Sequence, residues 1–290
     1  MKIVLKKNPN PASLGTDTGI LLNALAISLL ALTVMTLPAA ALADTVLITG
    51  ANSGIGLEFT RLYAARNWTV IATHRRSRTP ESLAKVTARY NNVRVEHMDV
   101  TSPDDIKALS MKLEGVPIDV LINNAGVYND RSACRKEDCP GDWSNQSFGK
   151  LNYRLLDTIM AVNVKGPLMV SEAFLKNVRA SRQKKIISIS STNGSLTEQL
   201  PGSGAIFYRA SKAALNRSMQ LVAAATRDEG VIVVLLHPGA VLTERQAYLA
   251  GYKGMVAMPF SVKHMIKTID KLTLQDTGHF LLYDGSTAPW

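Results

Sequence analysis

Short runs of apolar residues alternate along the chain with longer segments in which apolar residues recur at helical spacing. The first run, Val46–Ile48, is too short for a helix and is bounded by a glycine, so we interpret it as a buried strand. The seven runs of this kind are Val46–Thr49, Thr69–Thr73, Val93–Val95, Val120–Ile122, Lys185–Ser190, Val231–Leu236 and His279–Leu282. Strands separated by helix-length segments favour right-handed βαβ units. The pattern predicts an α/β fold with a doubly wound parallel sheet of about seven strands, in one domain over residues 44–290.

The first 43 residues have a different pattern, which is typical of a targeting segment. Three lysines among the first seven residues precede an apolar run at 20–37, and Ala41–Ala43 has the small-x-small form of a signal-peptidase site. We predict that residues 1–43 are a secretory signal, which would send the protein to the periplasm. The run is also long enough for an inner-membrane anchor, and the protein would then associate with the membrane through residues 20–37. If translation begins near Met35 instead, the protein would be cytoplasmic.

The chain carries a formal net charge of +10 at pH 7. Such an excess can indicate binding to nucleic acid or to an anionic membrane surface. Here the basic residues are scattered, and no basic run is interleaved with aromatic residues, so we expect no nucleic-acid partner. Cys134 and Cys139 are the only cysteines. They leave no disulfide framework and no plausible metal site, although one local disulfide could form in an oxidising compartment.

A glycine-rich turn follows the first predicted strand and precedes the first predicted helix. Gly50, Gly54 and Gly56 form this turn, whose spacing over Thr49–Gly56 is T-G-x-x-x-G-x-G. It differs from the G-x-G-x-x-G of the common dinucleotide fingerprint. A strand, a glycine turn and a helix N-terminus together make an anion site, because free backbone N–H groups and the helix dipole both favour a phosphate. We expect a cofactor phosphate to bind at this turn.

The second predicted strand ends at Thr73–Arg76, a position that selects between nicotinamide cofactors. NAD-selective sites place Asp or Glu there to bond the ribose 2′-hydroxyl, and this chain has neither. Arg75 can instead pair with a 2′-phosphate, so the sequence predicts NADP(H) in preference to NAD(H). The alternative is that Arg75 and Arg76 only begin a solvated helix.

Tyr208 and Lys212 form the central chemical pair of the sequence. Residues four apart lie on one face of a helix, so the phenol and the ammonium should point the same way. A free tyrosine has a pKa of about 10, and a nearby fixed positive charge stabilises the phenolate. The spacing therefore predicts that Lys212 lowers the pKa of Tyr208 and makes the tyrosine a usable acid and base.

Five motifs occur in the order in which the short-chain dehydrogenase/reductase family has them, so residues 44–290 resemble that family. They are T-G-x-x-x-G-x-G at Thr49–Gly56, N-N-A-G at Asn123–Gly126, the serine pair Ser190–Ser191, Tyr208 to Lys212, and H-P-G at His237–Gly239. Within the family, Tyr208–Asn216 and the tail Asp284–Trp290 are similar to the C-factor and carbonyl-reductase branch. The resemblance implies a Rossmann-type sheet of seven strands and assembly into homodimers or homotetramers.

The resemblance also implies a catalytic set, which in this chain is Asn163, Ser191, Tyr208 and Lys212. Ser191 would bond the substrate carbonyl oxygen, and Tyr208 would donate the proton. Lys212 would also bond the nicotinamide ribose, and Asn163 would hold a water of the proton relay. The family places its cofactor contacts at strand ends and in the turns after them. The implied contacts are Gly50, Asn52, Ser53, Gly54, Ile55, Gly56, Arg75, Asp99, Val100, Asn124, Ala125, Gly126, Tyr208, Lys212, Pro238, Gly239, Val241 and Thr243.

These features predict an NADP-dependent oxidoreductase that reduces an aldehyde or ketone to an alcohol, or the reverse. The alternative is an NAD(P)-binding signalling protein with little turnover, a role associated with the C-factor branch. The intact catalytic set favours the enzyme. Specificity for a small carbonyl or alcohol substrate would reside in Val127–Asn152, Leu196–Phe207 and Ala240–Pro259. Aromatic residues and methionines in the last segment suggest a moderately hydrophobic carbonyl.

Overall fold

The computed structural model describes residues 43–129, 143–198, 202, 204–242 and 254–290. In this part of the chain, a seven-stranded parallel sheet has the order β3-β2-β1-β4-β5-β6-β9. Its strands are β1 Thr45–Ile48, β2 Thr69–His74, β3 Val93–His97, β4 Val120–Asn123, β5 Lys185–Ile189, β6 Ile232–His237 and β9 Phe280–Leu282. Each strand overlaps one of the seven apolar runs, and the ends differ by at most two residues. The predicted α/β fold and its doubly wound parallel sheet are confirmed.

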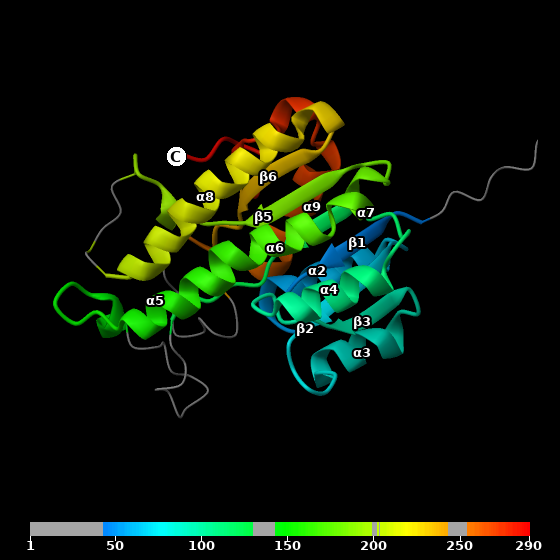
Figure 1. Ribbon diagram of the computed structural model, residues 1–290, viewed down its shortest axis with the longest axis horizontal. Helices are drawn as coiled ribbons and strands as arrows, with labels where there is room; N and C mark the ends of the chain where they lie inside the picture. The colour runs from blue at the N-terminus through cyan, green and yellow to red at the C-terminus, as the bar shows by residue number, and fades with distance from the viewer. Residues whose placement is uncertain (1–42, 130–142, 199–201, 203, 243–253) are drawn as a thin grey trace, which may run out of the picture. The chain divides into compact units, whose positions relative to one another are not determined.

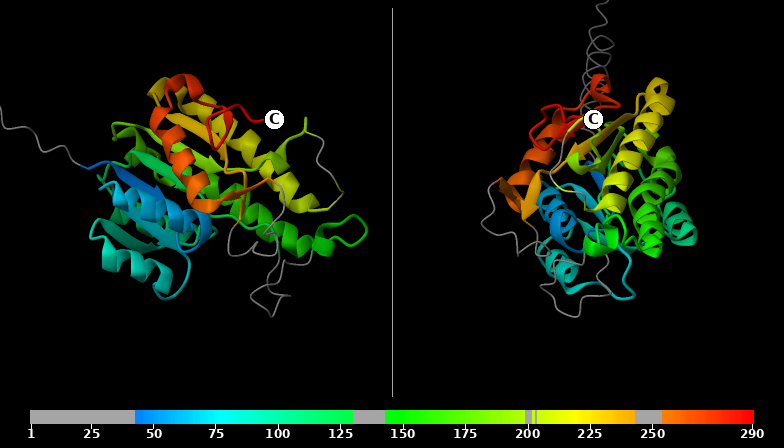
Figure 2. Two further views of the ribbon diagram at one scale, coloured as in Figure 1. Left: turned by 180° about the vertical axis from the view of Figure 1, so that it is seen from behind. Right: turned by 90° about the vertical axis from the view of Figure 1, so that its left-hand side faces the viewer.

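Helices cover both faces of the sheet (Figures 1 and 2). One face carries α2 (Gly54–Ala65), α3 (Glu81–Arg89) and α9 (Met258–Lys271). The other face carries α4 (Pro103–Lys112), α6 (Gly166–Ala173), α7 (Leu175–Arg179) and α8 (Ile206–Thr226). α5 (Tyr153–Met160) packs against α8 and continues into α6 through a π-helical turn, Ala161–Lys165. Four short 3₁₀ turns complete the described helices: Trp143–Gln146, Thr192–Gly194, Arg227–Glu229 and Leu274–Asp276.

Two hydrophobic cores hold the sheet between these helical layers. Alternate residues of a strand point to opposite faces, so Val46 and Ile48 pack with Phe59 of α2, whereas Leu47 joins the core that contains Phe174. All five side chains are fully buried. Truncating such a side chain to alanine costs about 2–5 kcal/mol. Packing on both faces therefore fixes where each strand ends, and the strand ends carry the predicted site residues.

The strand order reverses at β1, which has β2 on one side and β4 on the other. In a parallel sheet all carboxyl ends lie at one edge, and a crevice for ligands forms outside the point of reversal. The loops after β1, β2 and β4 leave the sheet at this edge. The topology therefore directs the glycine turn and the N-N-A-G segment to the same place.

A second, small sheet was not predicted from the sequence. β7 (Ala240–Leu242) pairs in parallel with β8 (Met255–Ala257), directly after Pro238 and Gly239. Each strand has three residues, which is too short for an alternating pattern to be recognised. The small sheet lies within the segment to which we assigned specificity.

Several predictions concern residues outside those that the structure describes. They are the signal or anchor within residues 1–42, the pairing of Cys134 with Cys139, and the cofactor contact of Thr243. Over the described ranges, no helix combines the length and the apolar character that crossing a bilayer requires.

Candidate active site

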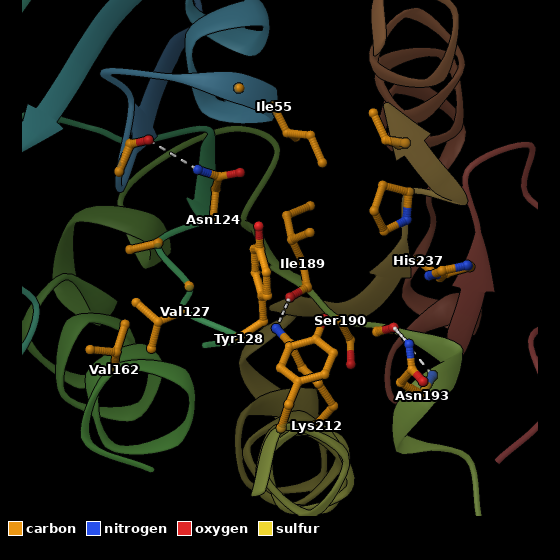
Figure 3. Close-up of a pocket in the computed structure, with 18 of the residues that line it drawn as sticks. Ile55, Asn124, Val127, Tyr128, Val162, Ile189, Ser190, Asn193, Lys212 and His237 are labelled. Atoms are coloured by element: carbon orange, nitrogen blue, oxygen red, sulfur yellow. Dashed lines mark hydrogen bonds between the residues drawn. The ribbon is translucent and has the colours of Figure 1, made fainter. Parts of the chain in front are cut away.

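A cavity of about 740 Å³ opens along the carboxyl edge of the sheet (Figure 3). Most of the predicted site residues line it. They are Gly50, Asn52, Ser53, Gly54, Ile55, Arg75, Asp99, Val100, Asn124, Ala125, Gly126, Ser191, Tyr208, Lys212, Pro238, Gly239 and Val241. Gly56 and Asn163 are described but do not line the cavity, and Thr243 lies outside the described residues. The fold thus brings strand-end segments that are far apart in the sequence to one cavity.

The glycine turn packs tightly against the N-N-A-G segment. Gly50 has a φ of +65°, and a Cβ atom there would lie 2.9 Å from Cα of Ala125. A Cβ on Gly56 would lie 2.4 Å from Nδ2 of Asn124, whose amide donates hydrogen bonds to the carbonyls of Thr49 and Gly50. Gly56 therefore allows α2 to pack closely against Asn124 and does not form part of the cavity wall. The packing leaves the N-terminus of α2 open to the cavity, as a phosphate site requires.

The end of β2 presents a guanidinium to the cavity and no carboxylate of its own. Arg75 is two-thirds exposed, and its Nη1 lies 3.9 Å from Oδ2 of Asp99, at the end of the third strand. His74 also lines the cavity, a position that the sequence did not single out. Burial lowers the pKa of His74, and the neighbouring His97 lowers it further, so His74 is neutral near pH 7. Arg75 is therefore the charged base that this corner presents to the cavity.

Ser191 lies where β5 leaves the sheet, and it is buried against the first residues that follow. Its hydroxyl accepts hydrogen bonds from the backbone N–H and the side-chain amide of Asn193 at 3.2 and 3.3 Å. Ser190 points elsewhere and donates to Oδ1 of Asn216 on α8. The two serines thus have separate partners. Of the two serines, Ser191 is the one that interacts with the phenol of Tyr208.

Tyr208 and Lys212 both lie in the first part of α8, and both face the cavity. The Lys212 ammonium lies 5.8 Å from the centre of the Tyr208 ring and donates to the carbonyl of Ile189 at 2.9 Å, as Figure 3 shows. Burial lowers the pKa of Lys212 to about 8. Burial raises the pKa of Tyr208 above its ordinary value, and the hydrogen bond with Ser191 offsets only part of the rise. The expected lowering by Lys212 is therefore not seen in the free protein, because desolvation of the phenol dominates.

Asn163 lies in the π-helical turn and is buried behind the cavity wall. Its side-chain oxygen accepts from the backbone N–H of Val127 at 2.9 Å. Its amide donates to the Val127 carbonyl at 2.7 Å and to the hydroxyl of Ser211 at 3.0 Å. These bonds occupy the side chain, which supports the Val127 backbone behind the cavity wall.

The segment after β6 forms the wall opposite the glycine turn. Gly239 has a φ of +81°, and a Cβ atom there would touch the ring of Tyr283 at 3.2 Å. The carbonyl of Pro238 accepts from the Ser261 hydroxyl at 2.6 Å. Burial, with the nearby Lys212 charge, lowers the pKa of His237 to about 4. His237 is therefore neutral at physiological pH, as expected for a structural residue.

Two residues of the site have no motif that points to them. Tyr128, just after N-N-A-G, lines the cavity, and Figure 3 shows its ring in the middle of the cavity between Asn124 and Ile189. Its ring meets that of Tyr208 edge to face, with 6.3 Å between centres. Gln146 comes from Val127–Asn152, a polar insertion between β4 and α5, and is completely buried beside both tyrosines. The described residues include no group of three or more His, Cys, Asp or Glu that could hold a metal ion.

Comparison with known proteins decides the family. The profile of the family described as short chain dehydrogenase matches residues 44–251. This chain belongs to the short-chain dehydrogenase family. The resemblance seen in the five motifs is thereby confirmed. This short-chain dehydrogenase is an enzyme of the carbonyl/alcohol oxidoreductase class.

Three similar proteins illustrate the range of its relatives. The dehydrogenase is 31% identical to the NADPH-bound carbonyl reductase from chicken fatty liver, with a TM-score of 0.75 and coverage of 86% of this chain and 99% of that one. It is 28% identical to a short-chain dehydrogenase/reductase from Burkholderia multivorans with bound NADP, with a TM-score of 0.71 and coverage of 86% and 100%. It is 36% identical to the C-signal of Myxococcus xanthus over 174 residues, which are 60% of this chain and 93% of that protein.

Proposed function

We propose that this short-chain dehydrogenase reduces an aldehyde or ketone with NADPH as the hydride donor. The observation that carries the proposal is the cavity itself, which holds Ser191, Tyr208 and Lys212 beside the glycine turn and the exposed Arg75. Its volume lies within the usual range of small-molecule sites. Ser191 reaches the cavity from the end of β5, whereas Tyr208 and Lys212 reach it from α8, so side chains of two elements can orient one reacting carbonyl.

The residues present fit a dinucleotide cofactor. The glycine turn opens the α2 N-terminus to the cavity, and the close approach of Gly50 to Ala125 leaves no room for larger side chains. Arg75 supplies a cation at the end of β2, where a 2′-phosphate would lie. The carbonyl reductase from chicken and the Burkholderia protein carry NADPH and NADP in their structures. When bound, the cofactor supplies hydride to the substrate carbon.

The side chains of the cavity complete the reduction by handling the oxygen. Ser191 donates a hydrogen bond to the carbonyl oxygen, and Tyr208 transfers its phenolic proton to that oxygen as the carbon gains hydride. Because the pKa of Tyr208 is raised, the phenol is protonated at neutral pH and ready to donate. Lys212 places a buried positive charge near the phenolate that results and stabilises it.

Replacement of Tyr208 by phenylalanine tests the proton donor. Tyr208→Phe removes only the hydroxyl, so we expect NADPH to bind with unchanged affinity by fluorescence titration. Turnover, measured as NADPH oxidation over a panel of aldehydes and ketones, should fall by at least 10²–10⁴-fold. Turnover near that of the wild type would contradict the assignment.

Replacement of Arg75 tests the cofactor preference. Arg75→Ala should raise the dissociation constant of NADPH about tenfold by removing a charge-assisted bond to the 2′-phosphate, and it should leave that of NADH unchanged. Arg76→Ala is the matched control. It removes the same charge from the next residue, and Arg76 does not line the cavity. Equal effects of the two variants, or an equal loss with NADH, would count against Arg75 as the selecting residue.

A second candidate function is signalling with little turnover, and the similarity to the C-signal of Myxococcus xanthus favours it. The two functions differ in one measurable property. A signalling protein would bind NADP(H) but show no oxidation of NADPH with any member of the carbonyl panel. The reductase would turn over at least one of them, and its activity would depend on Tyr208.

The remaining proposals concern the whole protein. We propose that residues 1–43 form a secretory signal or an anchor and that the folded domain spans 44–290 as a homodimer or homotetramer. N-terminal sequencing of the native protein would show a start at Asp44 if the signal is cleaved. Light scattering of the purified protein would give the oligomeric state.

A further inference from the structure

Gln146 is a fully buried side chain to which the mechanism assigns no role. It ends the 3₁₀ turn Trp143–Gln146 in the polar insertion, 62 residues before Tyr208. Its amide nitrogen donates to the carbonyl of Tyr128 at 2.7 Å, and its oxygen accepts from the backbone N–H of Tyr208 at 3.0 Å. Both partners lie in the cavity wall, and their rings meet edge to face. One side chain therefore ties together the two aromatic residues of the site.

The N–H that Gln146 binds has no acceptor within its own helix. α8 begins at Ile206, and its first internal bond runs from the N–H of Arg209 to the carbonyl of Ala205. Tyr208 is the third residue of the helix, so its N–H is one of the donors that every helix leaves unpaired. The residue before the helix, Ala205, has a φ of +58° and no side chain that could cap. Gln146 supplies the missing cap from the insertion.

The carbonyl side of Tyr208 is held by a second set of bonds. The hydroxyl of Ser211 donates to the Tyr208 carbonyl at 2.7 Å and accepts from the amide of Asn163 at 3.0 Å. Asn163 in turn binds both the N–H and the carbonyl of Val127. Since Val127 precedes Tyr128, the hydrogen bonds form a closed circuit. Gln146 is the member of this circuit that comes from the insertion.

We infer that Gln146 is a positioning residue, which holds the main chain of Tyr208 and Tyr128 so that the phenol of Tyr208 faces the reacting carbonyl oxygen. The inference rests on the proposed function, since it assigns Gln146 to the reduction carried out by Tyr208. Displacement of a reacting group by about 1 Å can cost about 10²-fold in rate. A loss of the cap would shift the start of α8 and Tyr208 with it.

Two variants test the inference by activity. Gln146→Met keeps the volume and removes both bonds, so kcat for a carbonyl that the wild type reduces should fall about 10–100-fold, while the affinity for NADPH stays within about twofold. Gln146→Glu keeps the acceptor, and its carboxyl group can donate to the Tyr128 carbonyl only when protonated. Burial raises the pKa of such a carboxyl. The kcat of Gln146→Glu should therefore approach that of the wild type at acid pH and fall away from it as the pH rises.

A third measurement is independent of activity. In protein labelled with ¹⁵N-tyrosine, the amide signal of Tyr208 can be assigned by its loss in Tyr208→Phe. Its hydrogen exchange should be at least about tenfold faster in Gln146→Met than in the wild type, because the bond to Gln146 is the protection that the structure gives it. This measurement tests whether Gln146 holds the main chain of Tyr208 separately from the reduction. Faster exchange with no carbonyl reduced would refute the proposed function and leave that contact standing.

Asn152→Ala is the control within the same insertion. Its side chain caps α5 by accepting from the N–H of Arg154 at 3.2 Å and has no bond to either tyrosine. It should lose stability without changing the exchange of Tyr208 or the pH dependence of kcat. Unchanged exchange and kcat in Gln146→Met would overturn the inference. So would a ratio of kcat values between Gln146→Glu and the wild type that does not change with pH.

Discussion

At the scale of single residues, burial of the Lys212 ammonium lowers the stability of the folded protein. Its ammonium is almost completely buried and has one described hydrogen-bond acceptor, the carbonyl of Ile189. Burial lowers its pKa from 10.5 to about 8. A buried cation whose pKa is lowered destabilises the folded state wherever the unfolded chain holds the proton more tightly. Lys212 therefore opposes folding at neutral pH while it serves the chemistry of Tyr208.

Replacement of Lys212 by methionine should make the protein more stable and inactive. The folded and unfolded pKa values differ by a few units, so at pH 7 the free energy of unfolding of Lys212→Met should rise by about 1–3 kcal/mol after the lost hydrogen bond is allowed for. Between pH 8 and 10.5 the wild type should gain stability as the folded lysine loses its proton, and the advantage of the variant should shrink. Urea unfolding at several pH values measures both effects.

Lys176→Met is the matched control, because the side chain of Lys176 is largely exposed and pairs only with an exposed glutamate. Its stability should change little at any pH. Two results would contradict the claim that burial of Lys212 destabilises the fold. One is a Lys212→Met protein less stable than the wild type at pH 7, and the other is a stability difference that does not shrink above pH 8.

At the scale of elements, the site depends on how the turn after β5 packs against α8. The 3₁₀ turn Thr192–Gly194 follows Ser191 directly and lies against the helix turn that carries Lys212. A Cβ atom on Gly194 would lie 2.6 Å from the backbone carbon of Lys212 and 2.7 Å from the nitrogen of Ala213. Backbone atoms cannot give way as a flexible side chain can. The distance between Ser191 and Lys212 is therefore set by a glycine.

Gly194→Ala should destabilise the protein and separate the two catalytic elements. We expect a loss of about 1–3 kcal/mol in the free energy of unfolding, from forced displacement of the turn or of α8. Gly204→Ala is the control for stability, because a Cβ on Gly204 meets no atom within 4 Å. Thermal or urea unfolding compares the two. If the free energy of unfolding fell no more in Gly194→Ala than in Gly204→Ala, the turn would accommodate a Cβ atom and the prediction would be wrong.

At the scale of the whole molecule, the sequence predicted the features that depend on residues close together in the chain. The seven strands are continuous apolar runs, and Tyr208 and Lys212 share a face because a helix repeats every 3.6 residues. Both features follow from neighbouring residues. The bond between Gln146 and Tyr208 joins residues 62 apart, and it exists only because the insertion folds back on α8. No pattern in the sequence could have predicted it.

Burial likewise appears only at the scale of the molecule. The sequence correctly placed Tyr208 beside Lys212, but it predicted a lowered pKa for the phenol, whereas burial raises it. Asn163 was placed in the catalytic set by its motif, and the π-helical turn directs its side chain to the Val127 backbone instead of the cavity. Such orientations depend on the packing of α5 and α6 against α8, which spacing along the chain does not encode.

The most direct test of the account is the transfer of deuterium from NADPH. Protein is incubated with NADPH that carries deuterium at both hydrogen positions of nicotinamide C4, together with an aldehyde or ketone from the panel. The alcohol should carry one deuterium on the former carbonyl carbon, as measured by mass spectrometry. Tyr208→Phe should yield labelled alcohol at a rate at least about 100-fold lower, although it binds the cofactor. An alcohol without deuterium, or no alcohol from any member of the carbonyl panel, would contradict the assignment of this cavity to NADPH-dependent reduction.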